Sequence, residues 1–273
     1  MDLLDVERIL ESISGLSRRF LDNLEVFSEV DSTNKYMLEQ PCPSPGRFQV
    51  AMAEHQTAGR GRLDRRWYSA PSTGICLSMS YTFASRPRDF SSLTLAIGAS
   101  VADTLNGLGI RGIGLKWPND LIIGDGKVGG ILTEVQPARA AGVTVVVGIG
   151  LNVDGQHAGE REGICGSIGR VTDLASCCDR LPSRSFISAA LIDCLFNAMA
   201  RFESDGFAPF IDSWQQFDWL RGQRIQVELT DELVPGVAQG IDDDGTLILE
   251  TRSGTRRIVS GSVRFADKSG VHL

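Results

Sequence analysis

The sequence QVAMAEHQTAGRGRLDRRW at residues 49–67, followed by GICLSMSYTF at residues 74–83, places a polar loop between two apolar runs. Short apolar runs of this kind are typical of buried strands. Strands are therefore predicted at Gln49–Glu54 and Gly74–Phe83, with the loop His55–Arg66 between them. From residue 56 to residue 67, four arginines minus one aspartate give a local charge of +3 in a chain of net charge −7.

Glycine and arginine alternate in this loop in a way that suits an anion. Gly59, Arg60, Gly61 and Arg62 stand in succession, so backbone N–H groups and guanidinium groups can approach one phosphate or carboxylate together. A solvated basic loop is the alternative, but a position between two strands favours binding. The loop lacks the G-x-x-x-x-G-K-[ST] and G-x-G-x-x-G patterns. By itself it predicts an anion site of unspecified purpose.

Two further motifs place charged groups at strand junctions. K-W-P-N-D-L at residues 116–121 gathers a lysine, an amide and a carboxylate around Pro118, which interrupts a sheet ladder. The cluster either binds phosphate or stabilises a turn, and both alternatives stay open. K-V-G-G-I-L at residues 127–132 follows the turn Asp125-Gly126, and alone it is more simply explained as an exposed lysine.

The remaining pattern predicts an α+β chain with a mixed sheet and flanking helices. Helices are expected at 3–21 with a break near Gly15, at 31–40, at Phe90–Leu108, at Ser185–Phe202 and at Pro209–Phe217. Further strands are expected at Glu25–Val30, Gly114–Trp117, Leu121–Ile123, Val128–Val135 and Val143–Gly150, whereas residues 154–182 look irregular.

After Leu220 the pattern changes to closely spaced short strands. They are expected at Arg224–Leu229, Val234–Gly240, Thr246–Glu250, Arg256–Val259 and Ser262–Phe265. Five strands with glycine turns between them predict a small β-barrel of SH3-like or OB-like type. The predicted domains are an N-terminal helix at 1–24, a catalytic domain at 25–220 and the barrel at 221–273.

Composition excludes several classes of protein. With 42% hydrophobic and 22% charged residues, the 273-residue chain can bury a core. Its net acidity makes neither DNA nor a membrane surface an expected partner. The six cysteines and three histidines lack metal-ligand spacing, so no metal site made by protein alone is expected. Without a signal peptide or a spanning apolar run of ~18 residues, a cytoplasmic location with reduced thiols is expected.

Five motifs, in this order, resemble those of the biotin–protein ligases. They are S-T-N at 32–34, A-E-H-Q-T-A-G-R-G-R at 53–62, K-W-P-N-D-L at 116–121, K-V-G-G-I-L at 127–132 and G-I-G-L-N-V at 148–153. G-R-G-R and K-W-P-N-D are specific, whereas the others are weak alone. The resemblance implies a catalytic domain related to the class II aminoacyl-tRNA synthetases, followed by an SH3-like β-barrel.

The resemblance also implies a two-step reaction. The biotin carboxylate attacks the α-phosphate of MgATP, which gives biotinyl-5′-AMP and pyrophosphate. A lysine amine on a biotin carboxyl carrier protein then attacks the mixed anhydride and releases AMP. No Met-Lys-Met acceptor triplet occurs in this chain, so the acceptor is another protein. Mg²⁺ is expected to be held with ATP.

The same resemblance implies roles for individual residues. Biotin contacts are expected from Ser32, Thr33, Asn34, Gln56, Gly59, Arg60, Gly61, Arg62, Lys127 and Gly130. ATP or adenylate contacts are expected from Arg62, Arg65, Trp67, Lys116, Asn119, Lys127 and Asn152. The residues expected to act in catalysis are Lys127, Arg60, Arg62, Lys116 and Asp120. Fixed cations stabilise phosphoryl charge, and a closing loop keeps water from the anhydride.

The chain departs from the family pattern at two places. Asp64 stands where the family usually has glycine, and it could pair with Arg65 or Arg66 and stiffen the loop, or weaken its pull on phosphate. About 22 residues precede the first expected strand, which predicts the ligase type without an N-terminal DNA-binding domain. The oligomeric state stays open, with a homodimer as one alternative.

The sequence disfavours two other functions. A lipoate or octanoate ligase would show an R-R-x-x-G-G-G run and a downstream histidine, and neither is present. A nucleic-acid-binding module is disfavoured because the chain is acidic and few aromatic residues accompany the arginines.

Overall fold

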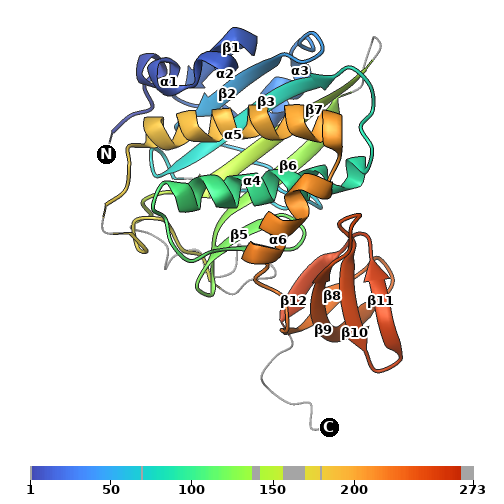
Figure 1. Ribbon diagram of the computed structural model, residues 1–273. Coiled ribbons are helices and arrows are strands. Elements are labelled where there is room, and N and C mark those ends of the chain that lie inside the picture. Colours follow the sequence, from blue (N-terminus) through green and yellow to red (C-terminus); the bar gives the residue numbers. More distant parts are fainter. Residues whose placement is uncertain (1, 69, 137–141, 156–169, 179, 266–273) are drawn as a thin grey trace.

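The computed structural model describes residues 2–68, 70–136, 142–155, 170–178 and 180–265. A large sheet forms the centre of the molecule, and a smaller sheet lies beside its lower end in Figure 1. The strands of the large sheet are β1 (Leu21–Phe27), β2 (Phe48–Ala53), β3 (Gly74–Phe83), β4 (Ile113–Lys116), β5 (Asp120–Ile123), β6 (Gly126–Gln136) and β7 (Val143–Asn152).

The large sheet is mixed, as predicted. Its seven strands follow the order β1-β2-β3-β7-β6-β5-β4. Only the β1–β2 pair is parallel among these neighbours, and the other pairs are antiparallel. The helices are α1 (Val6–Ser12), α2 (Gly15–Phe20), α3 (Thr33–Glu39), α4 (Leu93–Gly107), α5 (Arg184–Asp205) and α6 (Ile211–Phe217), with short 3₁₀ turns at Phe90–Ser92 and Ala208–Phe210.

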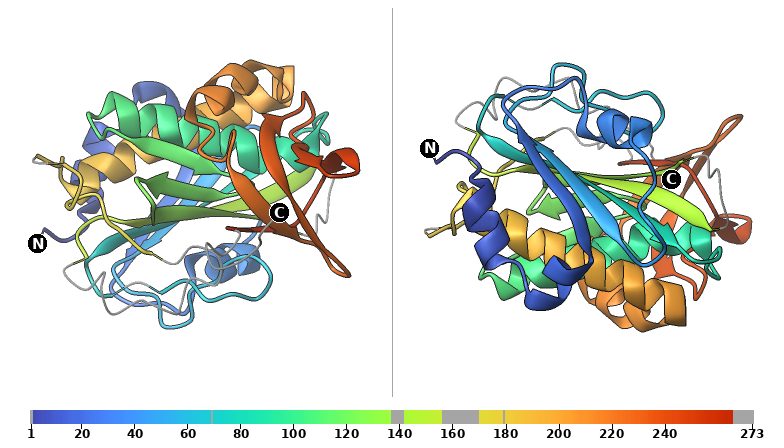
Figure 2. Two further views of the ribbon diagram at one scale, coloured as in Figure 1. Left: turned by 90° about the horizontal axis from the view of Figure 1, so that it is seen from below. Right: turned by 90° about the horizontal axis from the view of Figure 1, so that it is seen from above.

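Strand β7 shows why the two faces of the sheet differ. Val145, Val147 and Ile149 belong to the main hydrophobic core, whereas Gly148 and Gly150 alternate with them along the strand. Successive side chains of a strand point to opposite faces, so the apolar residues pack under the helices and the glycines lie on the other face. Figure 2 shows α4 and α5 on one face, and α3 with the loop after β2 on the other. The glycine face therefore has room for a ligand.

The N-terminal segment is helical within residues 3–21, and the break predicted near Gly15 is present. Two helices form, because Asp5 accepts hydrogen bonds from the amides of Glu7 and Arg8, and Ser14 accepts one from Ser17. Strand β1 begins at Leu21, four residues before the strand expected from Glu25. Side-chain caps and an early strand start are local features that apolar spacing does not resolve.

Helix α5 passes along the sheet as a core element. It is the one described helix with the length and apolar content to cross a bilayer, but 61% of that apolar stretch is buried inside the protein. Its length agrees with packing against α1, α4 and β3. The predicted irregular stretch at 154–182 lies partly outside the described residues, as do the last residues of the predicted barrel.

The second sheet consists of five antiparallel strands in the order β11-β10-β9-β8-β12. They are β8 (Arg224–Glu228), β9 (Leu233–Ile241), β10 (Leu247–Thr251), β11 (Gly254–Ile258) and β12 (Ser262–Phe265). Several contacts join this sheet to the large one: the indole nitrogen of Trp117 donates to the carbonyl of Gly245 at 3.1 Å. The rings of Trp219 and Phe265 meet edge to face, with centroids 5.2 Å apart. The second sheet therefore abuts the β4–β5 turn.

Candidate functional site

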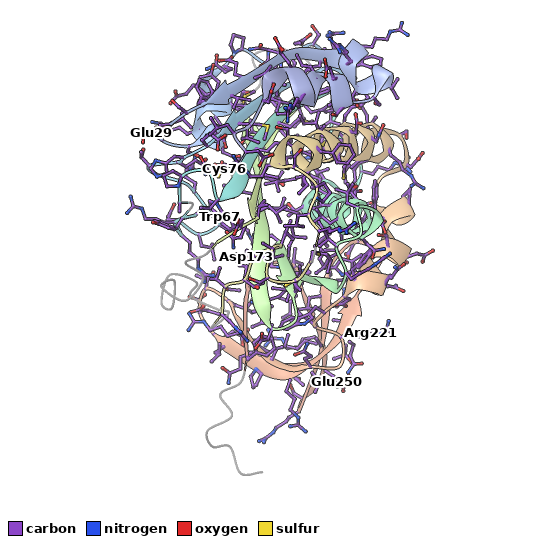
Figure 3. The ribbon with its side chains drawn as sticks, turned by 90° about the vertical axis from the view of Figure 1, so that its left-hand side faces the viewer. Glu29, Trp67, Cys76, Asp173, Arg221 and Glu250 are labelled. Atoms are coloured by element: carbon purple, nitrogen blue, oxygen red, sulfur yellow. The ribbon has the colours of Figure 1, made fainter. Side chains whose placement is uncertain are left out.

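A cavity lies on the glycine face of the large sheet. It is partly open to solvent and spans about 1260 Å³, a volume that includes open solvent at its mouth. Figure 3 shows Trp67 at this side of the sheet, across from α4 and α5. The cavity is lined by segments from the start of α3, the loop after β2, the β4–β5 turn, β6, β7 and the start of β12.

The floor of the cavity is a set of uncharged polar side chains that bond to one another. Gln56 accepts hydrogen bonds through Oε1 from the amide of Thr33 at 2.8 Å and from its hydroxyl at 3.1 Å. The Ser78 hydroxyl lies 2.7 Å from the Thr33 hydroxyl and 2.6 Å from Asn34 Oδ1. These groups are buried, so each is held in one orientation. Ser32 caps α3 through the amide of Lys35.

Glycines in β7 make room for the floor and for the aromatic wall. A Cβ added at Gly148 would overlap the Asn34 amide, and one added at Gly150 would overlap the Trp67 ring. The motif G-I-G-L-N-V therefore has a packing reason for both glycines. Its asparagine, Asn152, donates through Nδ2 to the carbonyl of Thr172 at 3.0 Å.

Lys127 and Gly130 lie on the same face of β6 although they are three residues apart. The β5–β6 pairing shifts register between Leu121 and Ile122. A bulge of this kind adds one residue to a strand, so two residues three positions apart can point to the same face of the sheet. The Lys127 ammonium donates to Asp120 Oδ1. A Cβ at Gly130 would lie 3.4 Å from Lys127 Nζ and 3.7 Å from Asp120 Oδ1. The bulge and the glycine together open the cavity to this lysine.

The backbone of Lys127 is fixed by a segment from beyond β7. Its amide donates to the carbonyl of Arg170 at 3.0 Å, and its carbonyl accepts from the amide of Thr172 at 2.9 Å. The same Thr172 accepts the Asn152 amide. Lys127 Nζ also lies 5.9 Å from the centroid of the Trp67 ring, within the range of a cation–π contact.

Lys116 is the most deeply buried cation of the site, at 1% exposure. Its ammonium donates to the carbonyl of Val263 in β12 at 2.8 Å, and lies 3.9 Å from Asp120 Oδ2. Asp120 therefore faces two ammonium groups, one from each neighbouring strand. The β4–β5 turn that carries this pair is tight, with Lys116 opposite Asp120.

Three arginines of the loop after β2 bond to three separate segments. Arg60 pairs with Glu134 at 2.9 Å, and Arg62 donates to Asn119 Oδ1 at 3.3 Å. Arg65 donates to the Ser262 hydroxyl at 2.9 Å. Burial lowers the pKa of the Arg62 guanidinium from its ordinary value, while Asp120 acts in the opposite direction. The arginine still carries its charge, because an ordinary guanidinium pKa lies far above neutral pH.

The loop itself is a tight hairpin with an unusual tip. Arg60 and Arg66 face each other as a β-bridge, and the amide of Gly61 donates to the carbonyl of Arg65 at 2.7 Å. At the tip, Leu63 and Asp64 have φ angles of 55° and 56°. Residues other than glycine rarely adopt this left-handed conformation, although aspartate tolerates it better than most. The glycine that the family usually has at this position would adopt the left-handed conformation without steric cost.

The structure brings the predicted site residues together with one exception. All but Gly59 line the cavity. Gly59 instead lies behind Trp67, where an added Cβ would overlap the Trp67 carbonyl oxygen. Close backbone approach explains this glycine without a ligand contact. For residues 116–121, phosphate binding and turn stabilisation were the two alternatives. They are compatible, because the motif forms the β4–β5 turn and also lines the cavity.

Sequence reasoning missed several residues of the site. Ser78 lies in the largely apolar run 74–83, where Ser80 and Thr82 follow at alternate positions and nothing distinguishes Ser78 from them. Glu134 lies near the end of β6 (Gly126–Gln136), which was predicted as a buried strand, and Ser262 and Val263 belong to the other sheet. Only the three-dimensional packing brings these three to the cavity rim or behind it. The arrangement can hold a neutral polar group on the floor and an anion between Lys116, Lys127 and Arg62.

Two family models match the chain. The Biotin/lipoate A/B protein ligase family matches residues 26–152, and the Biotin protein ligase C terminal domain matches residues 221–265. The chain is 31% identical over 270 residues to the bifunctional ligase/repressor BirA of Escherichia coli, which covers 98% of this chain and 80% of that protein. It is 32% identical over 247 residues to the biotin–[acetyl-CoA-carboxylase] ligase of Mycobacterium tuberculosis, with 88% of each chain covered.

Solved structures agree with these relatives. The biotin protein ligase from Aquifex aeolicus in complex with biotin and ATP superposes with a TM-score of 0.75 at 27% identity, and the match covers 90% of this chain and 100% of that one. The resemblance seen in the five motifs is confirmed by identity along nearly the whole sequence. The chain belongs to the biotin protein ligase family.

Proposed function

We propose that this enzyme activates biotin with MgATP to biotinyl-5′-AMP and then transfers biotin to a lysine of a biotin carboxyl carrier protein. One observation carries the proposal: an uncharged polar floor, whose side chains bond to one another, adjoins a group of cations within a single cavity. Biotin has a neutral cyclic urea at one end and a carboxylate at the other. The cavity offers a matching pair of environments.

The floor suits the urea ring. Thr33, Asn34 and Gln56 supply hydroxyl and amide groups that are oriented by hydrogen bonds within the floor, and Ser32 adds a hydroxyl that caps α3. A site built to bond an N–H or a C=O group discriminates against ligands that lack them, because its own polar groups would be left unpaired. A simple acyl chain such as octanoate would leave this floor unsatisfied.

The cations suit the reacting end. Attack of the carboxylate oxygen on the α-phosphorus forms the new P–O bond, breaks the bond to pyrophosphate and places charge on the phosphoryl oxygens. Lys127 stands at the junction between the two anions, and Lys116 and Arg62 flank it. Charge developed in the transition state is stabilised most by cations that are already fixed, and Asp120 fixes both lysines.

The nucleotide occupies the side of the cavity near Trp67 and Asn152. The Trp67 indole nitrogen is buried and has no hydrogen-bond partner within the described part of the chain, so it is available to a ligand. Mg²⁺ arrives with ATP as part of the substrate. Asn119 and Asp120 offer oxygen atoms beside the phosphates, and Arg65 extends the positive rim.

The loop from Arg60 to Arg66 covers the adenylate until the acceptor arrives. A mixed anhydride hydrolyses in water, so exclusion of water preserves it. The carrier lysine, as a neutral amine, attacks the biotin carbonyl carbon, and AMP leaves with the bonding electrons. The amine's proton is lost in the same step, and the amide bond is formed.

We infer that the chain has two domains. We place the catalytic domain at 25–220 and the second domain at 221–273, which is supported by the separate five-stranded sheet. We describe the two as a class II aminoacyl-tRNA synthetase-like domain and an SH3-like barrel. A cytoplasmic location is supported by the five cysteines of the described residues, which form no disulfide bond among themselves.

The test is transfer to a carrier domain. The protein is incubated with biotin, MgATP and an apo carrier domain, and the carrier's mass is followed with time. The expected result is a single mass increase equal to biotin minus water, which requires both ATP and the acceptor lysine. A parallel reaction supplies octanoate in place of biotin. Transfer of octanoate without transfer of biotin would overturn the proposal.

A further inference from the structure

Glu134 is a carboxylate that touches two parts of the site without lining the cavity. It lies on β6, two strand positions beyond Leu132, on the face that also carries Gly130. Its neighbour across the sheet is Val146. Its side chain is 20% exposed, and it is not among the described residues that line the cavity. Any effect on the reaction must therefore pass through other side chains.

Each oxygen of this carboxylate accepts from a different partner. Oε2 accepts from Asn34 Nδ2 at 2.9 Å, and Oε1 accepts from Arg60 Nη2 at 2.9 Å. Asn34 belongs to the floor, whereas Arg60 belongs to the loop that covers the cavity. Glu134 is thus the described side chain that bonds directly to both regions.

Asn34 is held in one orientation by this contact. Its Oδ1 faces the Ser78 hydroxyl at 2.6 Å, while its Nδ2 faces Glu134 and the Leu132 carbonyl at 3.3 Å. An amide rotated by 180° would place its nitrogen against a hydroxyl and its oxygen against two acceptors. A charged acceptor strengthens the observed orientation.

We propose that Glu134 is a positioning residue that ties the loop to the floor, and so slows the loss of biotinyl-AMP. The inference rests on the proposed function, since it needs an adenylate to retain. Arg60 is 44% exposed at its side chain and its ion pair is made with Glu134. When that pair forms, the loop is anchored at the position nearest to the biotin floor. When it breaks, the loop is free to lift at this end.

Glutamine at position 134 separates this role from simple packing. It has the same shape as glutamate, but one of its two terminal atoms is a donor instead of an acceptor. It can therefore accept from Asn34 or from Arg60, but not from both. Asn34 has a second acceptor in Leu132, so the loss falls mainly on Arg60.

The experiment measures adenylate retention. Parent protein, Glu134→Gln and Glu134→Ala are each loaded with radiolabelled biotin and MgATP, and the release of biotinyl-AMP is followed after dilution into unlabelled biotin. The matched control is Glu232→Gln, which removes the charge from an Arg256 ion pair in the second sheet. Single-turnover pyrophosphate formation is measured on the same samples, and thermal unfolding confirms that each variant is folded.

Release is expected to be about fivefold faster for Glu134→Gln and about tenfold faster for Glu134→Ala, as befits one charge-assisted hydrogen bond. Pyrophosphate formation should change less than release, and Glu232→Gln should match the parent in both. The double variant Arg60→Gln with Glu134→Gln should release the adenylate no faster than Arg60→Gln alone, because the two residues act through one contact.

Two results would overturn the inference, and they are distinguishable. Parent and Glu134 variants that form biotinyl-AMP and release it at equal rates would show that the pair is an ordinary surface ion pair. Additive effects in the double variant would show that Glu134 acts without Arg60. Failure of the parent to form biotinyl-AMP would instead overturn the proposed function, and the inference would fall with it.

Discussion

The floor and the rim of the cavity are built in opposite ways. Floor groups are uncharged, buried and bonded to one another within short distances, as in the contacts of Thr33 with Gln56 and Ser78. Rim groups are charged, and each reaches a partner from a different segment: Arg60 to Glu134, Arg65 to Ser262. The floor is therefore fixed before a ligand arrives, whereas the rim is held by contacts to separate segments, which can break one at a time. In the proposed function, the floor selects biotin, and the rim controls when the adenylate is released.

The largest effect is expected at the boundary between the two regions. Lys127→Ala removes the ammonium that contacts Asp120 and that, in the proposed function, faces the reacting anions. Loss of one fixed group that stabilises the transition state costs about 10²–10³ in rate. Adenylation, measured as biotin-dependent pyrophosphate release, should fall by that factor, while biotin binding by calorimetry should weaken less. Equal losses in binding and rate would place Lys127 on the floor instead.

Gly148→Ala should damage the floor and spare the rim. The added methyl group would overlap the Asn34 amide, and overpacking of this kind costs about 1–3 kcal/mol. The KM for biotin should rise by up to about 100-fold, whereas the KM for ATP should change little. Gly107→Ala is the matched control, because nothing lies within 4 Å of its added Cβ. An unchanged KM for biotin would show that the floor adapts to its occupant.

Arg62→Gly should damage the rim and spare the floor. It removes the guanidinium that donates to Asn119 and frees the loop, so biotinyl-AMP should escape roughly 30-fold faster, equivalent to about 2 kcal/mol. Release after dilution is the measurement, with free biotinyl-AMP in solution as a second readout. Retention equal to that of the parent would remove Arg62 from the closing role.

Ser262→Ala tests the contact from the second sheet. The variant loses the hydroxyl that accepts from Arg65 at 2.9 Å. Because one hydrogen bond is lost without disturbing the strand, the KM for ATP should rise about three- to fivefold. Steady-state kinetics should show the KM for biotin within twofold of the parent, by roughly the same estimate. A larger effect on biotin than on ATP would contradict the division between rim and floor.

Asp64→Gly should have the smallest effect. Asp64 adopts a φ of 56°, which glycine accepts without steric cost. The free energy of unfolding should rise by less than about 1 kcal/mol, and retention of the adenylate should change by less than about twofold. Chemical denaturation and the dilution assay check both. A marked slowing of release would show that aspartate at the loop tip speeds opening.

Much of the fold could be predicted because its signals are local. The run at residues 74–83 became β3 with the same bounds, and the change of pattern after Leu220 marks the second sheet. The motifs that line the cavity were visible as glycines and charges at strand junctions. Strand register could not be predicted in the same way. The bulge in β6 turns Lys127 and Gly130 to one face, and it does not alter the spacing of apolar residues in the sequence.

The partners of the rim were hidden for a different reason. Glu134 and Ser262 stand 74 and 197 positions from the arginines they contact. A single acidic or hydroxyl residue gives no indication in the sequence of a contact partner so far along the chain. The same limit applies to Gly59, whose place in a G-R-G-R motif suggested a ligand but whose packing behind Trp67 is a matter of three dimensions.

The bond between Lys116 and Val263 has a consequence for how this protein tolerates change. Its acceptor is a main-chain carbonyl, which every residue type at position 263 would supply. Scanning the side chains of β12 would therefore leave the bond untouched, and the sequence of the strand could drift while the lysine kept its partner. Insertion of residues at 221–223, between the two sheets, would shift the carbonyl itself. If Lys116 contacts ATP as proposed, nucleotide affinity should depend, through this bond, on the chain length at that joint and not on the side chain at position 263.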